Sequence, residues 1–246
     1  MKYRLLFSFV VLILPMGQGA DAASPEDLRR QADALVAEIR GRQPVYGLLA
    51  EQQDAYLLNW REQIRQYIAV NGGRNAPAAG RAIAAALALN ASAAYLSRSD
   101  DAGVDALLVQ QRRLMALAQT DAPLCGILLN TPTARLDENG RTPWLLRSPY
   151  KTMLPGLETA LFQVVGSAQG KAPRTLPDSQ GQQFTQRIAA RMGERFGREG
   201  LDDLERLQND NSAPALRCRG VYRLLDTIAE QPPELRTQLM RIYFGQ

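Results

Sequence analysis

Apolar residues recur every three or four positions along most of the chain beyond residue 23, and this spacing constrains the fold more than any other feature. Leu28, Ala32, Leu35 and Ile39 illustrate it near the start of the chain. Such spacing places apolar side chains on one face of an α-helix, whereas a half-buried strand needs alternating apolar and polar residues, and no run alternates convincingly. The sequence therefore predicts an all-α fold, a single compact multi-helix domain of about eight or nine helices.

Local signals mark where several of these helices begin and end. Ser24 followed by Pro25 predicts a start, because Ser caps the first turn and Pro suits its first position. Gly72 predicts an end, because glycine readily adopts the left-handed conformation that follows many helices. The triplet Ser99-Asp100-Asp101 predicts a further start.

The segment from about 77 to 96 is rich in Ala. Small side chains let helix axes approach each other closely. We therefore expect this segment to be a central helix, with Ile83, Leu87 and Ala94 facing inward.

Residues 1–22 have the three-part layout of a secretory signal peptide. Lys2 and Arg4 form a basic head, an apolar run follows, and small residues precede Ala23. About ten apolar residues rise only about 15 Å as a helix, half of a hydrocarbon core of roughly 30 Å, so a retained anchor is not expected. We predict cleavage between Ala22 and Ala23 and export to the periplasm, which leaves a helical domain over 23–246 with no stable membrane anchor.

The chain contains two cysteines, Cys125 and Cys218. In an oxidising compartment a lone pair of thiols usually forms a bond, which predicts a disulfide between them. The alternative is two independent buried thiols that pack as small apolar side chains. A Gly/Pro-rich connection at 169–177 is the best candidate for a soft domain boundary, but the predicted bond crosses it and favours one domain.

Several classes of function lack the residues that they need. The chain has no His, which removes Ser-His-Asp and Cys-His nucleophiles, histidine metal sites and histidine acid–base chemistry. No phosphate loop, metal motif or nucleophile elbow is present in its required context, so no cofactor and no metal are predicted. The net charge of +4 at pH 7 is too mild to indicate a nucleic-acid partner, and the basic residues are not clustered.

The segment 130–151 differs from the rest, because the helical spacing lapses and turn residues such as Asn139-Gly140 indicate an irregular loop or small hairpin. Irregular segments of this length are usually functional or disordered. Exposed Trp, Tyr and Arg are common interface anchors. We therefore predict binding residues in it: Arg141, Trp144, Arg147 and Tyr150. The alternative is a long connection with Trp144 folded inward.

Acidic residues are the remaining candidates for catalysis. The clustered carboxylates are Asp137, Glu138, Asp202, Asp203 and Glu205. Glycosidases use pairs of such groups across a cleft. The alternative, which we favour, is a solvated surface, because Glu194 with Arg198 and Asp202 with Arg206 have the four-residue spacing of helical ion pairs.

An aromatic stripe of Tyr56, Trp60 and Tyr67 follows helical spacing. These side chains could line a ligand pocket. Residues with this spacing more often form a core, with their polar tips reaching its rim, and we favour that interpretation.

These patterns favour a binding protein over an enzyme. The first hypothesis is a periplasmic helical protein that binds a protein partner, as an envelope adaptor or an immunity-type inhibitor. One alternative is a hydrolase of cell-wall glycan, which would hold two acids roughly 5–10 Å apart in a cleft, one with a raised pKa. The other is a helical carrier of an apolar ligand, which would enclose an apolar cavity between helices.

Overall fold

The computed structural model describes residues 23–121, 124–125, 128–129, 150–174, 177–207 and 212–245. Within these ranges the chain forms nine α-helices in a compact arrangement and no strand, which confirms the predicted all-α class. The proposed signal peptide over 1–22 lies outside the described residues, as does most of the predicted loop or hairpin near 130–151.

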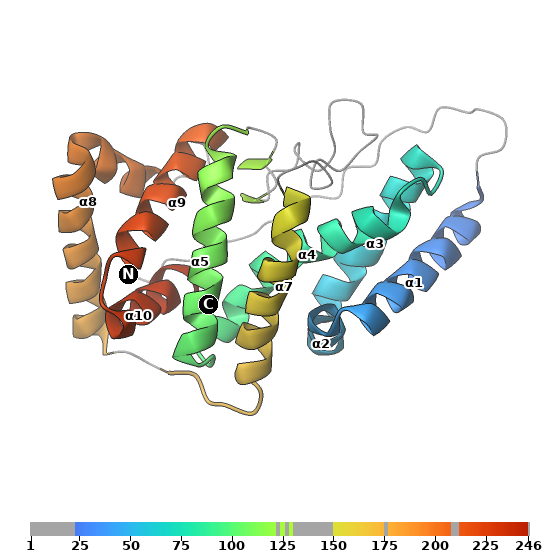
Figure 1. The fold of residues 1–246 in the computed structure, drawn as a ribbon, viewed down its shortest axis with the longest axis horizontal. Coiled ribbons are helices and arrows are strands. Elements are labelled where there is room, and N and C mark those ends of the chain that lie inside the picture. The colour runs from blue at the N-terminus through green and yellow to red at the C-terminus, as the bar shows by residue number, and fades with distance from the viewer. Residues whose placement is uncertain are drawn as a thin grey trace.

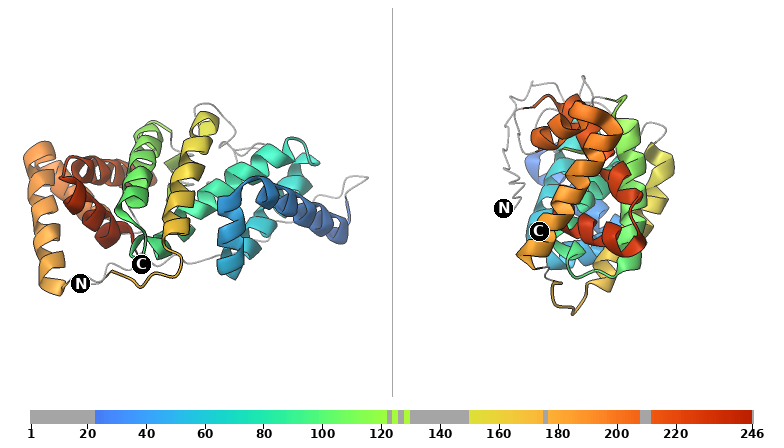
Figure 2. Two further views of the ribbon diagram at one scale, coloured as in Figure 1. Left: turned by 60° about the horizontal axis from the view of Figure 1, so that its bottom comes forward. Right: turned by 90° about the vertical axis from the view of Figure 1, so that its left-hand side faces the viewer.

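The helices form two regions that lie side by side along the long axis of the molecule, with α1 at one end and α8 at the other (Figures 1 and 2). The N-terminal region consists of α1 (Pro25–Arg42), α2 (Pro44–Gln52), α3 (Asp54–Asn71), α4 (Ala76–Leu96) and α7 (Tyr150–Ser167). The C-terminal region consists of α5 (Asp101–Ala118), α8 (Asp178–Leu207), α9 (Pro214–Ala229) and α10 (Pro233–Phe244). The regions meet where α5 packs on α7 and α10 contacts α4.

The predicted helix ends are confirmed at three places. Ser24 accepts a hydrogen bond from the Asp27 amide at the start of α1, and Asp100 accepts one from the Gly103 amide at the start of α5. Gly72 ends α3 in the left-handed conformation, with φ of 59°. Local sequence therefore determines where these helices begin or stop.

The Ala-rich helix α4 is central, as predicted, because α1, α2, α3, α7 and α10 all contact it. A side chain at Gly80 would place its Cβ 2.8 Å from Ile39 Cδ1 and 3.2 Å from Ile64 Cδ1, so glycine permits the close approach of α1 and α3. Ile83 is buried and Leu87 is half-buried, but Ala94 is exposed, which corrects its predicted inward position. Near its end, α4 meets α10 instead, where Arg241 donates to the Leu96 carbonyl over 3.1 Å.

Among the described helices, α4 is also the one long and apolar enough to cross a membrane. In the most apolar part of α4, 56% is buried inside the protein. This burial is what a core helix requires, and composition alone would not distinguish the two cases.

The predicted disulfide is present. Cys125 and Cys218 are bonded, with their Cα atoms 5.8 Å apart, and both side chains are fully buried. The bond joins residues 93 positions apart and ties the segment after α5 to α9. On the chain-entropy model, a loop of this length contributes about 4–5 kcal/mol of stability.

Candidate functional site

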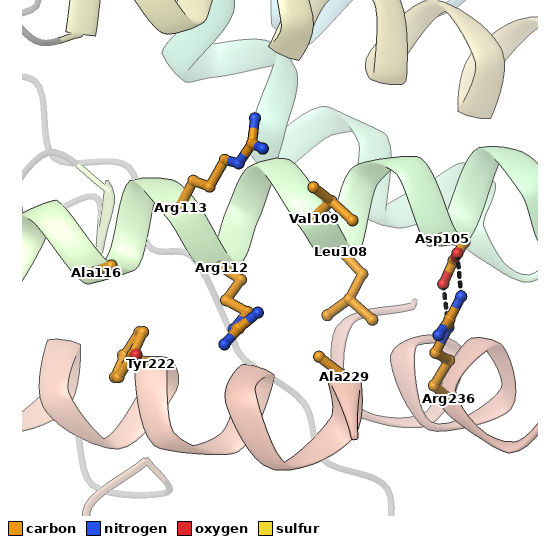
Figure 3. A pocket seen from close by; sticks show the side chains of 9 residues that line it. All are labelled: Asp105, Leu108, Val109, Arg112, Arg113, Ala116, Tyr222, Ala229 and Arg236. Carbon is orange, nitrogen blue, oxygen red and sulfur yellow. Dashed lines mark hydrogen bonds and ion pairs between the residues drawn. The ribbon is translucent and has the colours of Figure 1, made fainter. Parts of the chain in front are cut away.

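A groove runs between α5 on one side and α9 with α10 on the other (Figure 3). Its volume is about 380 Å³. We call it the α5 groove, and it is lined by Asp105, Leu108, Val109, Arg112, Arg113, Ala116, Tyr222, Ala229 and Arg236.

One face of α5 supplies most of this lining. Its six lining residues, from Asp105 to Ala116, follow one another at intervals of three, one, three, one and three positions. Residues at that spacing share a face of an α-helix, and eleven positions span about 16 Å. The groove is therefore a long strip along one helix, with Tyr222 and Ala229 of α9 facing it.

An ion pair closes one end of the α5 groove. Arg236 of α10 donates from Nε and Nη2 to the two carboxylate oxygens of Asp105, as the dashed lines in Figure 3 show. Both side chains are largely buried, with 28% and 29% of their surface exposed. Because both oxygens accept from one guanidinium, the single acidic side chain that lines the groove is already neutralised.

Arg112 has a carboxylate partner behind the groove. Its Nε donates to Asp226 Oδ1 over 2.6 Å, while Asp226 Oδ2 accepts from Arg195 over 2.7 Å. Asp226 is 10% exposed, whereas the Arg112 side chain is 48% exposed. Arg195 also pairs with Glu230 over 3.1 Å, so two carboxylates balance the two guanidinium groups, although the Arg112 side chain remains half exposed.

Arg113 and Val109 form the part of the groove that nothing in the described fold occupies. Arg113 is exposed and makes no ion pair or hydrogen bond with any residue that the structure describes. Val109, one turn before it on α5, is 44% exposed. Figure 3 shows both side chains along the edge of α5 that is turned away from α9. A guanidinium with no partner among the described residues, beside an exposed apolar side chain, suits a ligand that carries a carboxylate next to an apolar group.

The predicted binding residues are placed as follows. Arg141, Trp144 and Arg147 lie outside the described residues, so their role remains a prediction. Tyr150 is the first residue of α7 and is only 2% exposed. Burial raises the pKa of Tyr150, and the negative charge of Asp121 raises it further. Its ring therefore belongs to the core rather than to an open surface.

Asp203 departs most from the expectation of solvated acids. Its carboxylate is fully buried between α8 and α9, where it accepts hydrogen bonds from Arg219 and Arg223, the shortest to each being 2.8 Å. Arg206 donates to it over 3.0 Å. Burial alone would raise the pKa of Asp203, but its arginine partners outweigh that effect and lower the pKa from 3.8. This acid stays ionised and is a structural anchor.

The expected ion pairs on α8 are also corrected. Arg198 pairs with Asp202 over 3.0 Å, and Glu194 pairs with Arg191 over 2.6 Å. Beyond the kink, Arg206 binds Asp203 rather than Asp202. For Glu194 and Arg198 the cause is Gly197, whose φ of 61° and ψ of −148° interrupt the helix. Helical spacing does not continue across that kink, so Glu194 and Arg198 do not share a face.

The aromatic stripe of α3 is core, as we favoured. Tyr56, Trp60 and Tyr67 are 5%, 0% and 3% exposed. Their polar tips donate to backbone carbonyls, with Trp60 Nε1 2.9 Å from the Gly80 oxygen of α4. Each buried donor is therefore satisfied within the fold.

A second buried carboxylate, Glu158 of α7, was not anticipated from the sequence. It accepts from the Tyr46 hydroxyl over 2.7 Å and from Arg81 over 2.6 and 2.5 Å. This network joins α2, α4 and α7 and has no access to the α5 groove. Its role is structural.

Within the described ranges, no cluster of three or more Cys, Asp or Glu side chains is suited to hold a metal ion. Comparison of the chain with protein family models, with curated proteins and with solved structures finds no match. Function is therefore inferred from the geometry of the residues themselves.

Proposed function

We propose that this chain is an exported periplasmic protein that binds a protein partner, and that the α5 groove is its contact surface. One observation carries the proposal: Arg113 lies beside the exposed side chain of Val109, and it has no carboxylate partner in the described fold. Interfaces are typically anchored by arginine beside apolar contact area.

The covalent structure supports the proposed compartment. A buried Cys125–Cys218 disulfide is stable in an oxidising environment and uncommon in reducing cytosol. The basic head and apolar run of residues 1–22 are typical of a signal peptide that would deliver the chain there.

The geometry favours the two alternatives less. A glycan hydrolase needs a protonated acid with a raised pKa facing a second acid, yet the groove is lined by one acid and Arg236 binds both its oxygens. An apolar carrier needs an enclosed apolar cavity, whereas this groove is lined by three arginines, of which Arg112 and Arg113 are exposed.

The proposal is tested by affinity capture of oxidised, tagged mature protein (residues 23–246) from periplasmic extract of its host. We expect a stoichiometric partner that is lost with Arg113→Glu. The matched control is Arg187→Glu, which reverses an exposed arginine on α8 that also lacks a partner among the described residues. A partner that binds both variants equally would refute the groove as the contact surface.

The predicted segment near 130–151 is tested in the same experiment. Trp144→Ala combined with Arg147→Ala removes two of the interface anchors predicted from sequence. Loss of the partner in this variant as well would extend the contact surface to these residues. Retention there, with loss in Arg113→Glu, would confine it to the α5 groove.

A further inference from the structure

The shape of the α5 groove points to the kind of partner segment that it receives. The groove follows a single helix face for about 16 Å, the length of three helical turns. A groove of this form suits an amphipathic helix, which inserts side chains from one face at intervals of three and four. Its volume of about 380 Å³ is near the lower end for small-ligand sites, so it accommodates a few side chains rather than a large ligand.

The charge of the lining points to an acidic segment. Three arginines and one aspartate line the groove, and Arg236 already binds that aspartate. Arg113 has no carboxylate partner among the described residues, and Arg112 shares Asp226 with Arg195. Figure 3 shows Arg112 turned toward α9 and Arg113 turned to the opposite side of α5, so Arg113 is the group open to a ligand. A carboxylate placed on the Arg113 guanidinium would form charge-assisted, bidentate hydrogen bonds.

The apolar part of the lining points to one large apolar side chain next to that carboxylate. Ala116 of α5 and Ala229 of α9 are small and accessible, and Val109 is 44% exposed. Small residues on facing helices leave space that a Leu, Ile or Phe of a third helix fills. From these observations, and resting on the proposed function, we propose that the α5 groove binds an acidic amphipathic helix of the partner protein, with a carboxylate on Arg113 and an apolar side chain over Ala116 and Ala229.

A membrane surface is the less favoured source of anionic groups. Surface-bound proteins insert several bulky apolar side chains from one face. Here the large exposed apolar residues in the described part of the chain are spread over four helices, at Leu58, Val70, Val109, Phe162 and Leu201. Only Val109 belongs to the groove.

The test uses peptides of defined chemistry. A displayed library of random 16-residue peptides is selected on oxidised mature protein and counter-selected on the Arg113→Glu variant. We expect enriched peptides to carry Asp or Glu together with Leu, Ile or Phe at helical spacing. The best peptide, made synthetically, should bind roughly tenfold or more weakly to Arg113→Glu, and equally well to Arg187→Glu.

A charge exchange shows whether the contact is direct. Replacing the critical Glu of the peptide by Arg should weaken its binding to the unmodified protein and restore binding to Arg113→Glu. Absence of enriched peptides, enrichment without acidic residues, or failure of the exchange would overturn the inference. So would Arg113-dependent binding to phosphatidylglycerol vesicles at a protein concentration where no peptide binds.

The two proposals fail separately. A captured partner that is lost with Arg113→Glu, together with a library that selects no acidic peptides, would leave the proposed function standing and refute this partner chemistry. A captured partner that is indifferent to Arg113→Glu would refute the proposed contact surface itself.

Discussion

The two regions of this molecule are stabilised by different chemistry. In the N-terminal region, buried aromatic rings and small side chains fill the spaces between α1, α3 and α4, and polar tips bind backbone carbonyls. Its buried carboxylate, Glu158, is bound by one arginine, Arg81. In the C-terminal region, buried carboxylates are surrounded by arginines: Asp203 binds three and Asp226 binds two. Substitutions in the two regions should therefore differ in the size of the stability loss and in its dependence on pH.

Most arginines of the C-terminal region bind groups of the protein itself. The guanidinium carbons of Arg195 and Arg223 each lie 4.8 Å from the centre of the Phe196 ring. Two cations therefore share one aromatic ring through cation–π contacts. Most arginines near α9 are thus committed to the fold. Arg113 is exceptional among the groove residues, because no described residue binds it.

The largest effect is expected in the N-terminal region, from Trp60→Ala. Trp60 is fully buried and its ring lies 5.8 Å from both Tyr46 and Tyr56. Removing it should lower the free energy of unfolding by about 3–5 kcal/mol, as measured by urea denaturation. The control, Leu58→Ala on the exposed face of the same helix, should change it by less than about 0.5 kcal/mol.

Hydrogen exchange on Trp60→Ala tests whether the two regions unfold separately. If the regions are distinct, protection should fall most in α1, α3 and α4 and least in α8 and α9. An equal loss throughout the molecule would show that the two regions unfold as one cooperative unit.

The next largest effect is expected in the C-terminal region, from Asp203→Asn. This change leaves three arginines without their shared charge, and should lower the free energy of unfolding by about 2 kcal/mol. The figure is below that for a fully buried pair because the arginine side chains are 18–32% exposed. Asp202→Asn, next to it and paired at the surface with Arg198, should cost less than about 0.5 kcal/mol. Equal losses would contradict the anchoring role of Asp203.

Acid and alkali should affect the two regions differently. The lowered pKa of Asp203 means that its contribution is present above its unfolded value of 3.8 and is lost as pH falls through the lower folded value. Burial raises the pKa of Tyr56 well above 10.0, so its contribution is present below pH 10 and is lost as pH rises. The N-terminal region is thus expected to weaken first in alkali, and the C-terminal region first in acid.

Urea denaturation at pH 3, 7 and 10.5 checks this contrast. Asp203→Asn should lose less stability between pH 7 and 3 than the unmodified protein does. Tyr56→Phe should lose less between pH 7 and 10.5. Parallel pH profiles for all three proteins would show that these groups do not determine the pH dependence.

The smallest effect is expected from Arg113→Glu. Because Arg113 has no partner among the described residues, its reversal should change the free energy of unfolding by less than about 0.5 kcal/mol. Thermal unfolding of this variant beside Arg187→Glu measures the difference. A marked destabilisation would mean that Arg113 serves the fold rather than a partner.

Most of the fold could be predicted from local sequence. Capping residues such as Ser24 and Asp100 act on amides three positions away, so their effect is visible without a structure. The disulfide followed from having two cysteines. Helix α2 was not predicted, because it is short and no glycine marks its ends. The residues that flank it, Gln43 and Gln53, have extended backbone conformations.

The candidate site could not be predicted in the same way. Asp203 reads as a surface acid in its own segment, and its burial depends on Arg219 and Arg223, which lie 16 and 20 positions later on another helix. The α5 groove likewise combines α5 with residues more than 100 positions away, as in the Asp105–Arg236 pair. One signal was present in the sequence, namely the mixture of arginines and apolar residues on a single face of 105–116.

Site-specific crosslinking in the living host tests the central claim most directly. A photoreactive p-benzoylphenylalanine replaces Val109 in the α5 groove or, as the matched control, Leu58 in the N-terminal region, since both are exposed apolar positions on helices. We predict a discrete crosslinked adduct at Val109 that disappears when Arg113→Glu is added, and none at Leu58. An adduct at Leu58 alone, or one at Val109 that persists with Arg113→Glu, would contradict the account.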